Sequence, residues 1–145
     1  MARIKTNVKS LTNKYPSADL WITGHSRGGA MTTICALYLQ KHGYYAKTVI
    51  TFEQPRVGNK EFAEYFNHVF PHAMRFTHRN DLVPHLPPKS AGFVHTATEM
   101  FLNHGSSGFI ICDGSGEDPN CADGRKDAKS IKDHMFLFGR FSGCE

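Results

Sequence analysis

The sequence contains no long hydrophobic run. Across its 145 residues, no stretch approaches the roughly 18 consecutive apolar residues that a membrane-spanning helix requires. Residues 1–10 are rich in Lys and Arg, and no apolar segment of the kind found in secretory signal peptides follows them. We therefore expect a soluble chain without a transmembrane segment and without a signal peptide in the residues given.

A concentration of charge of one sign is also missing. The formal net charge is +4, but Lys and Arg are spread along the chain and separated by acidic residues. Proteins that bind nucleic acids typically gather their basic residues into one patch or stripe. The sequence therefore predicts no nucleic-acid partner.

Cysteines are few. The chain has 4 of them, too few for a small scaffold held together mainly by disulfides. Cys112 and Cys121 bracket a polar segment containing Gly, Asp and Pro, which turns easily, and this favours a disulfide loop. A disulfide would indicate an oxidising compartment. Cys35 lies in an apolar helical run and is predicted to be a small core residue.

The composition is that of an ordinary globular protein, with 40% hydrophobic and 21% charged residues. A chain of this length buries roughly two-thirds of its unfolded surface when it folds. No composition shift marks a linker, so we expect one domain over residues 1–145.

Helices and strands are predicted to alternate. Apolar periodicity and runs of β-branched and aromatic residues distinguish the two kinds of element. The predicted helices cover residues 3–14 (an amphipathic surface helix), about 30–41, and a segment capped by Asn59; the predicted strands cover residues 20–23, 48–52 and 74–78. A hairpin is predicted from residues 93–101 and 109–112. This order predicts an α/β fold with a mainly parallel sheet and flanking helices.

A Gly-x-Ser-x-Gly motif, residues 24–28, stands between the first predicted strand and the second predicted helix. In that context the motif forms a sharp turn that presents Ser26 at the carboxyl edge of the sheet as a nucleophile. Glycine is expected at both flanking positions because a Cβ there would collide with neighbouring elements. The backbone N–H of Arg27 is expected to point to the place where an oxyanion forms. In an ordinary loop the same motif would carry no function.

A serine nucleophile needs a histidine base, and the histidine needs a carboxylate that orients it. In α/β hydrolases the order along the chain is Ser, acid, His. Asp81 follows the third predicted strand, at the edge of the sheet where functional loops gather, and is the best candidate for the acid. The alternative is an aspartate that only opens a turn before Pro84.

The base must be one of 9 histidines. His68 and His72 have the spacing of zinc ligands on a helix, but Pro71 breaks that helix, so no metal site is predicted. His95 and His134 both lie downstream of Asp81, and chain order does not separate them. His25, in the nucleophile turn, is expected to point away from Ser26 and to pack or hydrogen-bond below it.

Three linked segments together resemble the class 3 lipases of the fungal type; they are residues 24–30, 51–59 and 75–88. The resemblance implies the α/β-hydrolase fold, with Ser26 as the nucleophile and Asp81 as the triad acid. It selects His134, within residues 133–139, as the triad histidine and gives His95 a structural place.

The resemblance also implies an activity and a location. It implies hydrolysis of a carboxylic ester, with acylglycerol as the expected substrate at a lipid–water interface, no metal or organic cofactor, and secretion. A feruloyl-type esterase and a truncated lipase-like protein without turnover are the alternatives. The Cys112–Cys121 loop looks like a family feature, whereas the family's partner for Cys144 lies in an N-terminal region absent here.

The sequence departs from the family pattern in two ways. Arg27 stands where the family usually has leucine, which puts a charge beside the acyl site. The segment that supplies the early strands, the second oxyanion donor and the lid is also absent from this sequence. We therefore expect an open sheet edge and weak activity of this chain alone.

Overall fold

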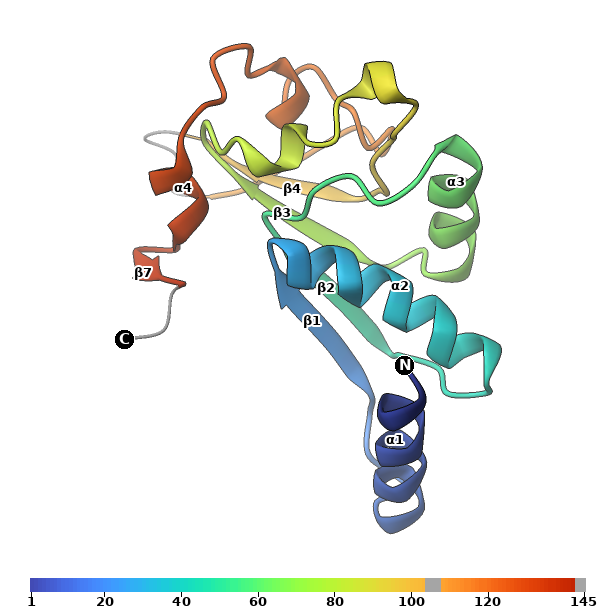
Figure 1. The fold of residues 1–145 in the computed structure, drawn as a ribbon. Coiled ribbons are helices and arrows are strands. Elements are labelled where there is room, and N and C mark those ends of the chain that lie inside the picture. Colours follow the sequence, from blue (N-terminus) through green and yellow to red (C-terminus); the bar gives the residue numbers. More distant parts are fainter. Residues whose placement is uncertain (104–107, 143–145) are drawn as a thin grey trace.

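The structure, a computed structural model, describes residues 1–103 and 108–142 and contains a five-stranded sheet in the order β1-β2-β3-β4-β5 (Figure 1). Strands β1 to β4 run parallel, and β5 pairs with β4 in the antiparallel direction. The strands are β1 (Trp21–His25), β2 (Thr48–Phe52), β3 (Met74–His78), β4 (Glu99–Leu102) and β5 (Ile110–Ile111); a separate hairpin consists of β6 (Phe136–Leu137) and β7 (Arg140–Phe141).

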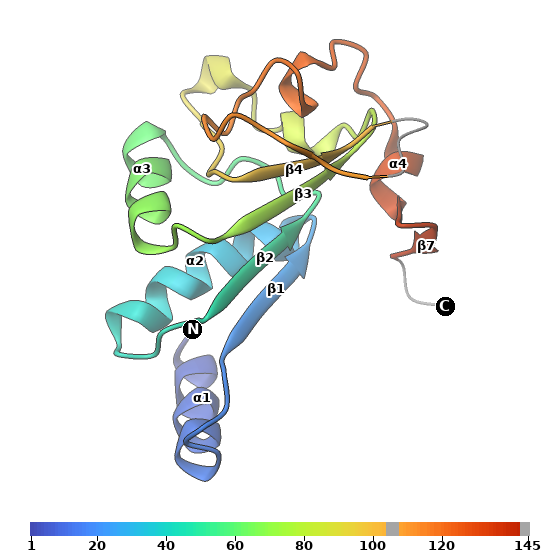
Figure 2. The same cartoon turned by 180° about the vertical axis from the view of Figure 1, so that it is seen from behind.

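Helices connect the parallel strands. Helices α2 and α3 lie on the same face of the sheet, as the two opposite views show (Figures 1 and 2). The helices are α1 (Ala2–Lys14), α2 (Arg27–Lys41), α3 (Lys60–Val69) and α4 (Ile131–Met135), with short 3-10 turns at Val83–His85, Lys89–Ala91 and Ala122–Gly124. The predicted α/β-hydrolase architecture with a mainly parallel sheet is confirmed.

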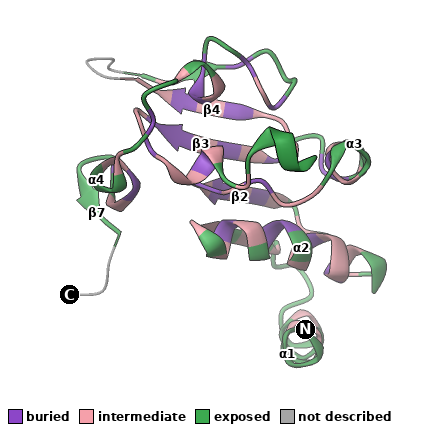
Figure 3. Cartoon of the chain, turned by 45° about the horizontal axis from the view of Figure 1, so that its top comes forward, coloured by how far each residue is buried: buried purple, intermediate pink, exposed green. Residues whose placement is uncertain are grey.

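The core lies between the sheet and the helices on that face. Ala36 from α2 and Val49 from β2 pack with Phe66 and Phe70 around α3, and all are at most 8% exposed. Buried residues concentrate in the central strands and on the inner side of α2 (Figure 3). The predicted cap of α3 is confirmed, since Asn59 Oδ1 accepts a 3.1 Å hydrogen bond from a backbone N–H in the first turn.

Two sequence predictions need correction. Helix α2 begins at Arg27 rather than near residue 30, because the N–H groups of Gly29 and Ala30 already donate to the carbonyl of Ser26. Cys35 is a free thiol of intermediate exposure rather than a core residue, because it lies beside the buried stripe of α2. Helix α1 forms as predicted, but none of its residues is buried.

The predicted hairpin is half right. Residues 99–102 and 110–111 pair as expected, but β4 also joins β3 in parallel and adds a fourth parallel strand. Residues 93–98 form no strand because their N–H groups bond elsewhere. The N–H of His95 donates to Glu117, and that of Ala97 donates to the side chain of Asn67.

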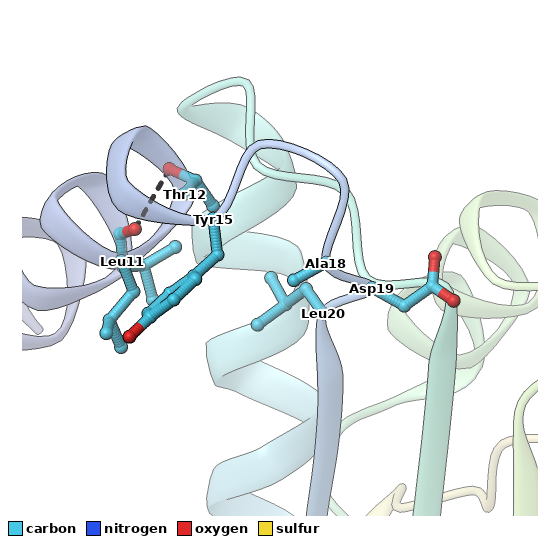
Figure 4. A pocket seen from close by; sticks show the side chains of 7 residues that line it. Leu11, Thr12, Tyr15, Ala18, Asp19 and Leu20 are labelled. Atoms are coloured by element: carbon cyan, nitrogen blue, oxygen red, sulfur yellow. Dashed lines mark hydrogen bonds between the residues drawn. The ribbon is translucent and has the colours of Figure 1, made fainter.

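The β1 side of the sheet is open. In the described part of the chain β1 pairs with β2 alone, and Trp21 is 64% exposed. Helix α1 extends past the start of β1, where a hollow of about 240 Å³ is lined by apolar side chains that include Leu11, Tyr15 and Leu20 (Figure 4). This hollow lies at the opposite end of β1 from Ser26 and is not the candidate active site.

Candidate active site

Ser26 occupies the turn between β1 and α2 in a strained conformation. Its φ is 58° and its ψ is −130°, a region that non-glycine residues rarely adopt and that costs about 1–3 kcal/mol. The backbone N–H of Ser26 continues the β1–β2 ladder by donating to Phe52 O at 2.8 Å. This ladder bond fixes the nucleophile turn to the end of the sheet.

The glycines of the motif have different roles. A Cβ at Gly24 would lie 2.4 Å from the carbonyl oxygen of Gly28 and 2.6 Å from Thr32 Oγ1, so glycine is required there. The expectation of a collision at Gly28 is wrong, because a Cβ built there meets nothing within 4 Å. The close approach falls instead at Gly29, whose Cβ would lie 3.1 Å from Gln54 Cβ.

The structure brings Ser26, Asp81 and His134 together. His134 Nδ1 lies 2.8 Å from Asp81 Oδ2, and His134 Nε2 lies 2.8 Å from Ser26 Oγ. Because an ionised carboxylate only accepts hydrogen bonds, the proton belongs on Nδ1, which leaves Nε2 free to accept the hydroxyl proton. Asp81 and His134 are 2% and 7% exposed, so bulk water screens their interaction little.

Local backbone bonds hold Asp81 and His134 in place. The other oxygen of Asp81 accepts a 2.8 Å bond from the N–H of Val83. A parallel β-bridge joins Asp81 to Ser130, and the hydroxyl of Ser130 caps α4 by accepting from the N–H of Asp133 at 2.9 Å. The helix that carries His134 therefore begins directly beside the acid.

Two further histidines support the segment that carries His134. The Nε2 atom of His25 bonds to the carbonyl of His134 at 2.9 Å, and the Nδ1 atom of His78 bonds to the carbonyl of Asp133 at 3.1 Å. The rings of His25 and His134 lie 4.6 Å apart. Burial lowers the pKa of His25, opposed by its bond to the His134 backbone. Sequence reasoning assigned no role to His78, since only the fold brings it to α4.

The structure separates the two candidate bases. His95 is 3% exposed, and its Nε2 donates to the carbonyl of Pro84 at 2.6 Å, whereas Asp81 faces His134. Burial, followed by the charges of Arg75 and Arg56, lowers the pKa of His95 well below its usual range. Neutral His95 therefore fastens the loop that follows Asp81.

Arg56 anchors the same loop from the other side. Its guanidinium makes two 2.7 Å bonds to the carboxylate of Glu117 and donates to the carbonyls of His85 and Pro87 at 2.8 and 3.0 Å. A bidentate Arg–carboxylate pair of this kind is strong and geometrically specific. Sequence reasoning did not single out either partner, because they are 61 residues apart.

Arg75 on β3 and Glu99 on β4 form a buried ion pair. Arg75 contacts the Glu99 carboxylate at 3.1 Å, and both side chains are at most 2% exposed. Thr77 and the N–H of Ala122 also donate to Glu99. The predicted disulfide Cys112–Cys121 is present beside this pair, with a Cα–Cα distance of 6.3 Å. Cys144, predicted to be unpaired within this chain, lies outside the described residues.

The described residues offer one close group of potential metal ligands. Glu99, Cys112 and Cys121 place one donor atom each within 4.8 Å of one another. Both sulfur atoms are bonded in the disulfide, and the carboxylate is occupied by Arg75 and Thr77. The donor set therefore does not suit a metal ion.

Two other residues complete the surroundings of the triad. Arg27 is exposed and is the first residue of α2, so its backbone N–H has no acceptor within the helix. Glu53, which sequence reasoning missed, directly follows β2 and is 0% exposed.

Among residues 1–103 and 108–142, none of the helices has the length and hydropathy needed to cross a membrane.

Curated proteins similar to this chain include lipases of fungi. A lipase of Rhizomucor miehei is 33% identical over 135 residues, which is 90% of this chain and 37% of that protein. The secreted mono- and diacylglycerol lipase 1 of Fusarium solani is 38% identical over 120 residues, covering 78% of this chain and 36% of the relative. The chain thus spans little more than a third of the length of these relatives.

Solved structures share the fold closely. A Rhizomucor miehei lipase in complex with its propeptide superposes with a TM-score of 0.85 at 32% identity, covering 98% of this chain and 47% of the other. A triacylglycerol lipase described as having a serine protease triad at its catalytic centre gives a TM-score of 0.86 at 33% identity, with 96% and 54% covered. Because the sequence pattern described as "Lipase (class 3)" matches residues 1–91, well over half of the chain, this protein belongs to the class 3 lipase family.

Proposed function

We propose that this protein hydrolyses the carboxylic esters of acylglycerols, with Ser26, His134 and Asp81 as its catalytic triad. The observation that carries the proposal is the pair of 2.8 Å hydrogen bonds that joins Ser26 Oγ to Asp81 through the ring of His134. The nucleophile, base and orienting acid therefore already stand within hydrogen-bond reach of one another.

The chemistry follows from the proton positions. His134 Nε2 accepts the proton of Ser26 as Oγ attacks the ester carbonyl, and the imidazolium that forms is stabilised by Asp81. The imidazolium then returns this proton to the leaving alcohol as the acyl–enzyme forms. Water, activated by the same ring, attacks the acyl–enzyme, which releases the fatty acid and restores Ser26. No metal or organic cofactor takes part in this sequence.

The negative charge that develops on the carbonyl oxygen needs hydrogen-bond donors. The unused backbone N–H of Arg27, at the N-terminal end of α2, is one such donor, and the dipole of this helix favours an anion at the same place. Losing a single oxyanion donor typically costs about 100- to 1,000-fold in kcat. With Arg27 as the one donor we assign, this chain alone is expected to be a weak esterase.

The substrate class and location rest on the relatives. The Fusarium solani relative is named as a mono- and diacylglycerol lipase and as secreted. An acylglycerol substrate at a lipid–water interface and an extracellular location are therefore our proposals for this protein. The Cys112–Cys121 disulfide supports an oxidising environment.

Labelling with a fluorophosphonate probe tests the nucleophile. Mass spectrometry should find the adduct on Ser26, and the Ser26→Ala variant should remain unlabelled. A folded wild-type chain that takes up no probe would identify a lipase-like scaffold without turnover.

Hydrolysis assays test the substrate class and the contribution of a second oxyanion donor. A short p-nitrophenyl ester, a monoacylglycerol and a feruloyl ester should be compared, with Ser26→Ala as background. The acylglycerol should be preferred, and preference for the feruloyl ester would overturn the assignment. Adding the N-terminal segment of a class 3 lipase should raise kcat; equal rates with and without it would show that Arg27 suffices.

A further inference from the structure

Glu53 is a buried acid in an unusual backbone conformation. It follows β2 directly, its N–H donates to Phe76 O at 2.9 Å, and its side chain is 0% exposed. Its φ of 49° lies in the left-handed region, which a glutamate rarely adopts. Neither carboxylate oxygen of Glu53 accepts a hydrogen bond of normal geometry. An ionised carboxylate left in this state would be very costly.

Three residues act directly on the carboxyl group of Glu53, and a fourth acts through Asp81. The carboxyl group of Asp81, from the loop after β3, is close enough to act on the pKa of Glu53. On β3, the Arg75 charge and the backbone N–H of His78 favour the ionised form, and the His78 ring bonds to α4. From α4, His134 reaches Glu53 only through Asp81.

None of the cations neutralises Glu53. Arg75 already contacts Glu99 at 3.1 Å and donates to the carbonyl of Gly116 at 2.9 Å. The two oxygens of Asp81 each have a donor, Val83 N–H on Oδ1 and His134 Nδ1 on Oδ2, so Asp81 is the ionised member of the acid pair. Two ionised carboxylates in direct contact would repel each other, and a single proton between them removes the repulsion.

We infer that Glu53 is a protonated carboxylic acid that donates a hydrogen bond to the carboxylate of Asp81 and so acts as a positioning residue for the triad acid. Burial raises the pKa of Glu53 well above its usual range, and the hydrogen bond and charge of Asp81 raise it further. The protonation of Glu53 follows from its burial and its neighbours and does not depend on the proposed function. Its role in positioning the triad acid does rest on that function.

Infrared difference spectroscopy tests the proton without any need for activity. At pH 7 the wild-type chain should show the carbonyl band of a protonated carboxylic acid, shifted in D₂O, and the Glu53→Gln variant should lack it. Absence of that band from the folded wild type would overturn the inference.

The pH dependence of the melting temperature gives a second readout. The unfolded chain ionises Glu53 near pH 4.3, whereas the folded chain keeps its proton to a higher pH. The contribution of Glu53 to stability is therefore fully present below about pH 4.3 and is lost as pH rises toward the folded pKa. Relative to Glu53→Gln, the wild-type Tm should fall steadily over this window. Parallel Tm curves would contradict a retained proton.

Turnover tests the positioning role. Glu53→Leu, which fills the site without a donor, should lower kcat about tenfold with little change in KM, as expected for one lost bond to a charged group. Glu53→Gln restores a neutral N–H donor and should recover most of that loss. In an Asp81→Asn background, Glu53→Leu should have no further effect. Equal losses in both backgrounds would sink the positioning role.

The two proposals fail in different ways. If the wild-type chain is folded but takes up no fluorophosphonate, the proposed function is wrong, while the infrared and melting measurements still decide the protonation of Glu53. If labelling and turnover are normal but the carboxylic acid band is missing, the triad stands and the role of Glu53 is wrong. If Glu53→Leu does not fold, the Glu53→Gln comparison still decides.

Discussion

The two flanks of the sheet differ sharply in how they are held. On the β1 flank, Trp21 is 64% exposed and α1 has no buried residue. On the β3–β4 flank, Arg75, Glu99 and Phe101 are each 1% exposed, and a disulfide lies beside them. Most of the polar interactions sheltered from water therefore gather on one side of the sheet.

The three residues of the proposed triad come from both flanks. Ser26 is carried by β1, on the exposed flank, whereas Asp81 follows β3, on the buried flank. His134 reaches both, since its ring contacts Ser26 and Asp81 and its carbonyl contacts His25 at the end of β1. Asp81 is therefore held from the buried flank, whereas Ser26 is held by the β1–β2 ladder and by the first turn of α2.

The largest expected effect is the loss of activity when His134, which contacts residues of both flanks, is replaced. His134→Ala should lower kcat by several orders of magnitude, as loss of a triad base generally does. His95→Ala, on the buried flank, should reduce stability and leave the kcat of the folded fraction close to wild type. Steady-state kinetics on an activated ester would measure both. Comparable losses of kcat in the two variants would contradict the assignment of the base.

The next largest effect is on the free energy of unfolding, and it distinguishes a buried ion pair on one flank from an exposed ion pair on the other. Arg75→Met leaves Glu99 buried without its cation and should cost about 3–5 kcal/mol of unfolding free energy. The matched control is Lys47→Ala, since Lys47 pairs with Asp19 with both side chains more than half exposed, and this pair should contribute about 0–1 kcal/mol. Urea denaturation measures both. Similar losses of unfolding free energy in the two variants would mean that ion pairs stabilise the two flanks equally.

The disulfide sharpens the comparison further. Replacing both Cys112 and Cys121 with serine should destabilise the chain by about 2–3 kcal/mol, mainly because the unfolded chain gains freedom. Peptide mapping without reduction should recover the two cysteines in one linked pair. Recovery of Cys121 joined to Cys144 would show a different pairing.

The smallest effect on stability belongs to the open edge. Trp21→Thr should change the free energy of unfolding by no more than about 0.5 kcal/mol, because the side chain is mostly exposed. It should nevertheless reduce self-association, since exposed edge strands with large apolar side chains promote aggregation. Light scattering at increasing protein concentration tests this. Unchanged self-association would indicate that the exposed edge of β1 does not mediate it.

Much of the structure could be predicted from patterns among residues close together in the sequence. The nucleophile turn, the Asn59 cap and the disulfide loop each depend on residues close together in the chain. What was missed depends on long-range contacts. The parallel pairing of β4 with β3 was missed, because β4 begins with Glu99, a poor strand former, and the cation that pairs with this acid is Arg75, 24 residues away in the chain.

The details of the site were missed for the same reason. His78 and Asp133 are 55 residues apart, so their bond leaves no local pattern. The close approach falls at Gly29 rather than at Gly28, because the nearby Gln54 side chain belongs to the next strand connection. Glu53 reads as an ordinary polar residue after a strand, and only its burial beside Asp81 makes it notable.

The contact of His25 with the backbone of His134 has a mechanical consequence. Since β1 ends at His25, directly before Ser26, one strand end carries the proposed nucleophile and also bonds to the carbonyl of its proposed base, His134. If the exposed edge tilts or slides, both attachment points travel in the same direction. The bond from His25 therefore makes the spacing between Ser26 and His134 less sensitive to a displacement of β1.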